Sequence, residues 1–278
     1  MIRLKEHEFA DIVEYMRAHY GINLEKKKIL IECRMSNTLE KQGMSSFSSY
    51  MELLKKDRTE RLAAEMINRL TTNYTYFFRE DSHFEILTSE IFPKLFQQKR
   101  FRPLNIWCAG CSTGEECYTL AMTLQEYMEK AGAFPLVRIL GTDISEDVIS
   151  RAQRGIYPIR EIDSIPQSLR SKYCHVAADY KSFQMDENLK EHIRFKRQNL
   201  MVPAAAAEKY DLIMCRNVMI YFDRASRKKL IQKLENSLNP GGYLMIGHVE
   251  LLSRDETWLE SVYPAVYLNK DREDKKNL

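Results

Sequence analysis

The stretch Trp107-Cys108-Ala109-Gly110-Cys111-Ser112-Thr113-Gly114-Glu115-Glu116 decides the fold of this chain. The apolar run that begins at Leu104 and ends at Ala109 predicts a buried strand, and the small residues after it predict a turn. A helical pattern then continues from Glu115 to about Lys130. A strand, a glycine turn and a helix in this order begin an open α/β sheet, in which ligands bind at the carboxyl ends of the strands.

Three kinds of chemistry could use this turn. The Trp-Cys-x-x-Cys spacing at 107–111 resembles a redox dithiol, although a thioredoxin-type domain is much shorter than this chain. The turn also matches Gly-x-Ser-x-Gly, the nucleophile elbow of hydrolases, with Ser112 as nucleophile and Asp211 and His248 following in hydrolase order. Finally, small residues before a helix suit a nucleotide-type cofactor, because the helix start offers free N–H groups. The turn alone leaves all three open.

Composition narrows the functional classes. The chain has 278 residues, of which 44% are hydrophobic and 29% charged, so it can bury a sizeable core and is not disordered throughout. The net charge of +3 is too small to indicate nucleic-acid binding. No apolar run approaches a membrane span and no signal-peptide segment follows Met1, so we expect a cytoplasmic protein without membrane insertion.

The cysteines do not form a recognisable metal motif. Cys108, Cys111 and Cys117 lie close together, but no histidine adjoins them and a fourth ligand is missing. In a cytosolic chain, free buried thiols are the usual state. The sequence therefore predicts no metal site.

Hydrophobic periodicity divides the chain into three parts. Residues 1–72 predict an N-terminal all-α domain, and residues 73–103 predict a linker made of a loop and a helix from 82 to about 98. Residues 104–278 predict an α/β domain with a Rossmann-like parallel sheet, because strands and helices alternate there. The expected strands are 104–109, 137–142 and 210–215, and the expected helices lie near 115–130, 145–153 and 224–238.

The alternation of strands and helices breaks between about residues 156 and 199. Short strand-like pieces appear there at Cys174–Ala177, Ser182–Met185 and Ile193–Arg197. We interpret all three as a small antiparallel β subdomain inserted into the α/β domain.

Polar residues follow the expected strands at the ends where a ligand would bind. Glu116 follows the first turn, Asp143 ends the second strand, and Arg216 and Asn217 follow the strand at 210–215. An acidic residue at the end of the second strand suits a ribose diol. The Gly-x-Gly-x-x-Gly pattern of nicotinamide folds is absent, whereas S-adenosylmethionine has no pyrophosphate and needs only a looser glycine turn. This pattern favours an adenosine-bearing cofactor of that kind.

Several long motifs now occur in a specific order along nearly the whole chain. Together they resemble the CheR-type chemotaxis receptor (methyl-accepting chemotaxis protein) methyltransferases, and they are Thr71–Glu80, Trp107–Glu116, Gly141–Ile144, Cys215–Asp223, Pro240–Leu244 and Gly247–Glu250. Two departures are Cys117, where the family usually has proline, and Val249, where serine is common. Neither departure falls on a residue to which the resemblance gives a role.

The resemblance implies an activity and its participants. Enzymes of this family transfer a methyl group from S-adenosylmethionine to glutamate side chains of chemoreceptors, giving glutamyl 5-O-methyl esters in chemotactic adaptation. The implied partner is the cytoplasmic helical domain of a receptor, and some relatives bind a receptor C-terminal peptide through the inserted β piece by adding a strand. We expect a monomer.

The resemblance also implies site residues. Our own candidates for holding the substrate carboxylate in line with the methyl group are Arg79, because a guanidinium gives fixed bidentate recognition of a carboxylate, and Tyr221. The residues expected to bind the cofactor are Asn73, Thr75 and Arg79 at its methionine end, Glu116 in the crevice, Asp143 on the ribose, Asn199 and Leu200 beside the adenine, and Arg216 and Asn217 along the wall. A serine esterase using Ser112, Asp211 and His248 stays the alternative.

Overall fold

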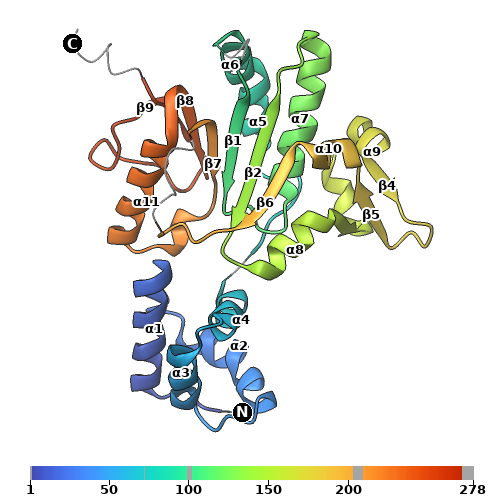
Figure 1. Ribbon diagram of the computed structural model, residues 1–278. Coiled ribbons are helices and arrows are strands. Elements are labelled where there is room, and N and C mark those ends of the chain that lie inside the picture. The colour runs from blue at the N-terminus through green and yellow to red at the C-terminus, as the bar shows by residue number, and fades with distance from the viewer. Residues whose placement is uncertain (1, 72, 99–101, 203–208, 271–278) are drawn as a thin grey trace.

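Four amphipathic helices make up the N-terminal domain of the computed structural model, which describes residues 2–71, 73–98, 102–202 and 209–270. They are α1 (Glu6–Tyr20), α2 (Lys28–Lys41), α3 (Phe47–Lys56) and α4 (Arg61–Leu70). Their apolar faces meet in one core that includes the fully buried Met16, Ile31, Phe47 and Met66. In Figure 1 this all-α domain lies below the sheet.

A buried aromatic contact anchors the linker to the α/β domain. Its helix is interrupted, because α5 (Ser82–Ile86) passes through a π-helical segment (Leu87–Ile91) into α6 (Phe92–Gln98). Before α5, the fully buried Phe77 makes an edge-to-face contact with Tyr157 at a centroid distance of 4.9 Å. Such contacts fix the path of the chain towards the α/β domain.

Seven strands of the described part form one mostly parallel sheet (Figure 1). Their order is β6-β2-β1-β7-β8-β10-β9. The pairs from β6 to β8 are parallel, and β10 runs antiparallel to both β8 and β9. The strands are β1 (Leu104–Ala109), β2 (Val137–Asp143), β6 (Ile193–Arg197), β7 (Tyr210–Cys215), β8 (Leu238–Ile246), β9 (Glu260–Tyr263) and β10 (Val266–Leu268). The chain moves in opposite directions from β1, to β2 on one side and to β7 on the other. This switch point leaves a crevice at the carboxyl ends of the strands.

Helices cover both faces of the sheet. Side chains along a strand alternate between these faces, so each strand contributes to two cores. From β1, Ile106 and Cys108 belong to the core beneath α7 (Glu115–Ala131), whereas Trp107 and Ala109 belong to the core beneath α11 (Arg224–Ser237). A strand buried on both faces reads as a continuous apolar run, and all six residues of β7 are buried. Within the described residues, no helix is long and apolar enough to span a membrane.

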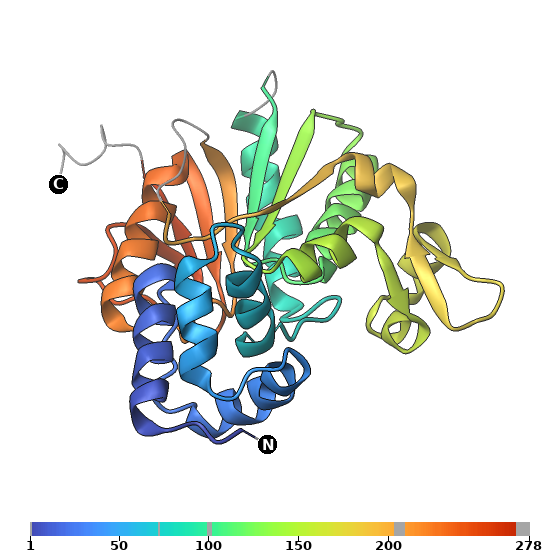
Figure 2. The ribbon, with the colours of Figure 1, turned by 60° about the horizontal axis from the view of Figure 1, so that its bottom comes forward.

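The inserted subdomain is smaller than the sequence predicted. After α8 (Glu146–Arg154) come three antiparallel strands in the order β3-β5-β4. Its described elements are β3 (Ile156–Pro158), a 3₁₀ turn (Ile159–Ser164), α9 (Gln167–Tyr173), β4 (Cys174–Val176), β5 (Ser182–Met185) and α10 (Glu187–Glu191). Figure 2 shows the insert extending from the β6 side of the sheet, away from β8 and α11.

The assignment of Ile193–Arg197 to this insert was wrong. That segment is β6, which pairs in parallel with β2 along Ile139–Asp143 and forms the edge of the main sheet. The reason is a packing match: a Cβ on Gly141 would lie 2.7 Å from the Phe195 ring, so the glycine makes room for this side chain. The main sheet therefore resumes at Ile193, and the insert ends before it.

Candidate active site

A pocket lies where the all-α domain, the linker and the carboxyl ends of the strands meet. Apolar side chains of the all-α domain, such as Ile22 and Leu30, form part of its wall. Folding brings to it every residue that the sequence singled out for cofactor binding or catalysis, namely Asn73, Thr75, Arg79, Glu116, Asp143, Asn199, Leu200, Arg216, Asn217 and Tyr221. Two domains therefore contribute to one site.

Asp143 is fixed by the turn that follows β1. One carboxylate oxygen accepts the backbone N–H of Ser112 at 3.0 Å, and the other accepts that of Ser145 at 3.0 Å. Burial raises the pKa of Asp143, and these N–H groups oppose that rise. The cap of α8 is Ser145, whose hydroxyl accepts the N–H of Val148, so Asp143 is not the helix cap. The N–H of Ile144 also donates to this carboxylate. The two oxygens together have about four acceptor sites, so the carboxylate retains one for a ligand.

Arg216 connects three parts of the wall. Its side chain is 2% exposed, and its guanidinium lies 3.2 Å from the carboxylate of Glu116 and 3.3 Å from that of Glu80. It also donates to the carbonyl of Arg79 and lies over the Phe84 ring at 5.4 Å. Burial raises the pKa of Glu116 to about 7, with Arg216 acting in the opposite direction. Although burial opposes it, Arg216 holds the pKa of Glu80 below its ordinary value.

The sequence analysis missed the role of Glu80, which it placed at the end of a family motif without giving it a role. In the structure the carboxylate of Glu80 accepts hydrogen bonds from the guanidinium of Arg216 and from the side-chain amide of Asn217, the latter at 3.1 Å. Its backbone has a positive φ of 54°, which is uncommon for a residue other than glycine. The turn at Glu80 therefore directs its carboxylate towards the strand ends.

Arg79 is held by its own loop. Its guanidinium donates to the carbonyl of Tyr74 at 2.8 Å and lies 5.8 Å and 6.0 Å from the ring centres of Tyr74 and Tyr76. These contacts occupy one edge and one face of a planar group that has five N–H donors. Tyr221 lines the same pocket as Arg79. Burial raises the pKa of Tyr221, and the positive charge of Arg79 opposes that rise.

Glu250 holds the loop that carries Asn217 and Tyr221. Glu250 is 1% exposed. Its carboxylate accepts hydrogen bonds from the backbone N–H groups of Asn217 at 2.7 Å, Gly247 at 2.9 Å and Ile220 at 3.1 Å. The sequence placed Glu250 in a family motif without giving it a role. These hydrogen bonds, together with one from the N–H of Met219, fix the backbone from which Tyr221 projects.

We expect Glu250→Gln to lower kcat by about tenfold and the free energy of unfolding by about 1–3 kcal/mol, because an amide turns one acceptor into a donor that faces backbone N–H groups. The rate of methyl transfer, the activity that the family resemblance implies, would be measured well below the melting temperature, beside a urea titration. Asp255→Asn, on an exposed residue of the same connection, is the matched control. A wild-type kcat in the Glu250 variant would show that the loop does not need this carboxylate.

The esterase interpretation is not supported, because its three residues do not meet. The hydroxyl of Ser112 donates to the carbonyl of Asn73 at 2.9 Å, at the carboxyl end of β1. The carboxylate of Asp211 accepts the N–H of Asn105 at 3.0 Å, at the opposite end of the same sheet. His248 is exposed and stacks edge-to-face on His83 at 4.4 Å instead.

The dithiol interpretation also lacks a reactive thiol. Cys108 and Cys111 are free and buried. Burial raises the pKa of Cys111 to about 11, whereas a redox-active cysteine needs a lowered pKa.

Comparisons with known proteins agree with the site. Residues 7–71 match the family model of the CheR methyltransferase all-alpha domain, and residues 73–267 match that of the CheR methyltransferase SAM binding domain. A chemotaxis protein methyltransferase of Borreliella burgdorferi is 42% identical over 271 residues, covering 96% of this chain and 95% of that protein. One from Vibrio anguillarum is 33% identical over 254 residues, covering 91% and 92%. Chemotaxis protein methyltransferase 2 of Pseudomonas aeruginosa is 34% identical over 265 residues, covering 94% and 92%. The chain therefore belongs to the CheR methyltransferase family and uses S-adenosylmethionine as its methyl donor.

Proposed function

We propose that the protein methylates glutamate side-chain carboxylates of chemoreceptors, giving glutamyl 5-O-methyl esters. The observation that carries this proposal is that Arg79 and Tyr221 both line the pocket at the carboxyl ends of the strands. A planar cation and a phenol in one pocket suit a carboxylate, because a guanidinium can hold both of its oxygens. The names of the relatives, chemotaxis protein methyltransferases, support a receptor as the substrate.

The residues of the pocket fit S-adenosylmethionine. Asp143 would take the ribose hydroxyls, and the buried Leu200 would lie against the adenine. The amide of Asn199 already bonds the backbone of His19 and Met201, so we infer that it holds Leu200 in place. At Gly110 the φ is +85° and a Cβ would lie 2.4 Å from Val218, so only glycine allows this tight turn.

The methionine end of the cofactor needs partners of both charges. Its α-amino group is a cation and its α-carboxylate an anion. Glu116 would face the amino group, and Arg216 with the polar side chains of Asn73, Thr75 and Asn217 would face the carboxylate. The guanidinium Nε of Arg216 is buried without a hydrogen-bond partner in the described structure, which leaves one donor for such a ligand.

This site would accelerate methyl transfer mainly by positioning the substrate carboxylate against the methyl group. When bound, S-adenosylmethionine supplies an electrophilic methyl group on a positively charged sulfur. A glutamate side chain has an ordinary pKa near 4.3 and is already an anion at neutral pH, so the protein need not supply a base. Arg79 and Tyr221 would orient the carboxylate while the apolar wall keeps water out. Orientation of this kind can supply on the order of 7–11 kcal/mol.

Two surfaces would receive the receptor. We propose that its helical cytoplasmic domain presents the glutamate at the pocket, and that a C-terminal receptor peptide adds a strand to the small sheet of the insert. In that sheet β3 and β4 are the outer strands, and Val176 of β4 is 44% exposed. An outer strand has unpaired backbone groups that an extended peptide can bond.

The class of product is tested by incubating the protein with receptor-rich membranes and S-adenosylmethionine that carries a tritiated methyl group. A glutamyl methyl ester releases its label as volatile methanol in mild base. We expect the receptor band to be labelled and the label to be base-labile. Label that survives base would exclude an ester.

The rate of methyl transfer at saturating cofactor should stay nearly flat from about pH 6 to 9, because the substrate carboxylate is ionised throughout that range. The affinity for S-adenosylmethionine should fall as the pH drops below about 7, because Glu116 has its pKa raised to about 7 and loses its charge there. Single-turnover rates corrected for ester hydrolysis, together with calorimetric titrations, give both profiles. A rise in rate centred near pH 6.5 that His248→Ala abolishes would instead identify a histidine base.

A further inference from the structure

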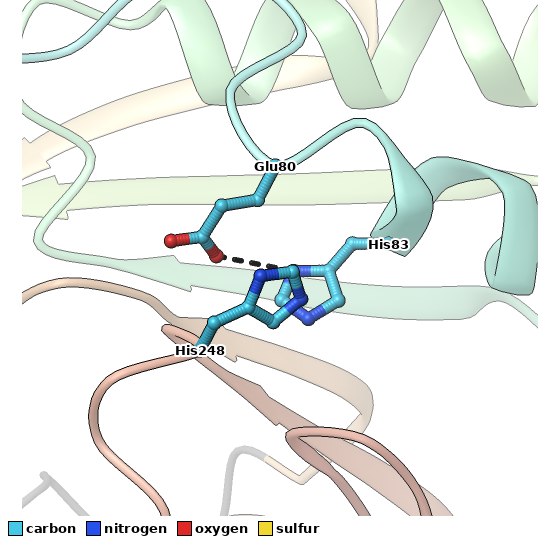
Figure 3. Close-up of side chains that lie close together, drawn as sticks. All are labelled: Glu80, His83 and His248. Atoms are coloured by element: carbon cyan, nitrogen blue, oxygen red, sulfur yellow. Dashed lines mark ion pairs between the residues drawn. The ribbon is translucent and has the colours of Figure 1, made fainter.

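Three side chains of the kinds that bind metal ions meet behind the wall of the pocket. They are Glu80 of the linker, His83 of α5 and His248 of the loop after β8, and Figure 3 shows their polar ends directed towards one another. One ligand atom from each lies within 4.8 Å of the others. The sequence analysis predicted no metal site, since Glu80 and His83 lie about 165 positions before His248.

His83 gives a second and independent sign of a missing ligand. It is fully buried, and both of its ring nitrogens lack a hydrogen-bond partner in the described structure. Its Nδ1 lies 3.5 Å from the carboxylate of Glu80, which is longer than a good hydrogen bond. Buried polar atoms are nearly always satisfied, so an orphaned imidazole beside two other donors indicates a ligand.

We propose that Glu80, His83 and His248 bind one zinc ion, with water as its fourth ligand. Two imidazoles and one carboxylate suit zinc, whereas magnesium and calcium prefer oxygen ligands alone. Ligand atoms of a tetrahedral zinc site lie roughly 3.3 Å apart, given bonds of about 2.0 Å. The ligand atoms already lie within 4.8 Å of one another, and His248 is exposed, so its side chain has room to rotate towards this spacing. The same exposure provides a path of entry for the ion.

Zinc at this site would act on the cofactor pocket through Glu80. The carboxylate oxygen of Glu80 that faces His83 is also the one that lies 3.3 Å from Arg216. A cation bound there competes with Arg216, which would keep only Glu116 as its carboxylate partner. We therefore expect zinc to weaken cofactor binding, and the cofactor to weaken zinc binding by the same factor, since coupling between two sites is reciprocal. This coupling rests on the proposed placement of the cofactor, whereas zinc binding itself does not.

The test is a zinc titration of the full chain in competition with a chromophoric chelator. It is done in a Cys33→Ser background, because Cys33 is an exposed thiol that could bind zinc by itself. We expect one zinc ion per chain, and we expect His248→Ala to bind it at least about tenfold more weakly while keeping its basal methyl transfer. His175→Ala is the matched control, since His175 is another exposed histidine beside a carboxylate, that of Asp186.

Cobalt substitution and the cofactor product complete the test. Cobalt bound to this site should give visible absorption bands that His248→Ala removes and His175→Ala keeps. S-adenosylhomocysteine should weaken zinc binding in the wild-type background. The site is overturned if micromolar zinc fails to bind, or if the His248 variant binds it as the parent does. The coupling is overturned if zinc affinity is the same with and without S-adenosylhomocysteine.

Discussion

Arg79→Lys should lower the rate of methyl transfer by about 100-fold or more at saturating cofactor, a loss typical of removing a group that orients the reacting atoms. Lysine keeps the positive charge but has neither the planar fork that donates to Tyr74 nor the flat face that lies against the rings of Tyr74 and Tyr76. It therefore cannot present two parallel donors to the substrate carboxylate. The fold should be unaffected, because Arg79 is partly exposed and its partners are in its own loop.

Single-turnover labelling of a receptor measures this loss, and circular dichroism during heating checks the fold. Arg17→Lys is the matched control: Arg17 is a partly exposed arginine on α1, paired with Glu14 and away from the pocket lining. A variant at Arg79 that turns over at the wild-type rate, with an unchanged melting temperature, would show that the guanidinium plays no part in orientation.

Asp143→Ala should weaken the binding of S-adenosylhomocysteine by about 1–3 kcal/mol, roughly 5- to 150-fold in Kd. The carboxylate is lost as the expected ribose acceptor, and the backbone N–H groups of Ser112 and Ser145 lose their partner as well. The turn after β1 then loses its bond to the end of β2, so part of the effect comes from a less ordered pocket.

Isothermal titration calorimetry measures the affinity directly. Glu146→Ala, at the exposed first position of α8, controls for the loss of a neighbouring acidic residue. Asp143→Asn separates the two contributions, since it keeps one acceptor oxygen for the backbone. An unchanged affinity in Asp143→Ala would remove the ribose assignment.

Much of the α/β domain could be predicted because its signals are local. The strand at 104–109 has the predicted bounds, and the helix after it begins at Glu115 as the sequence indicated. Polar residues directly after buried strands were predicted to share one site for a geometric reason: the carboxyl ends of parallel strands meet at one edge of the sheet. This reasoning places Asp143 and Arg216 in the same pocket, where the structure has them.

The errors and omissions have the opposite cause, since they depend on contacts between distant parts of the chain. Whether Ile193–Arg197 joins the insert or the main sheet is decided by its pairing with β2, about 50 positions earlier, and by the fit of Phe195 against Gly141. Neither contact leaves a periodic signal in the segment itself.

The same limit applies to the polar network around the pocket. Glu80 meets Arg216 across 136 positions, and Glu250 meets the N–H of Asn217 across 33. His83 and His248 each look like an isolated histidine in the sequence, and only the packing of α5 beside the loop after β8 joins them. The sequence motifs include Glu80, Glu250 and His248, but they do not show which side chains contact one another.

The central claim is that a glutamate carboxylate receives the methyl group, and one mass-spectrometric measurement tests it most directly. A receptor is incubated with the protein and S-adenosylmethionine that carries a trideuterated methyl group, digested, and its peptides are sequenced before and after mild base. We expect the heavy methyl group on glutamate side chains, and we expect mild base to remove it. With the Arg79→Lys variant in place of the wild-type protein, the label should be nearly absent. A heavy methyl group on lysine, arginine or histidine that survives base would contradict the account.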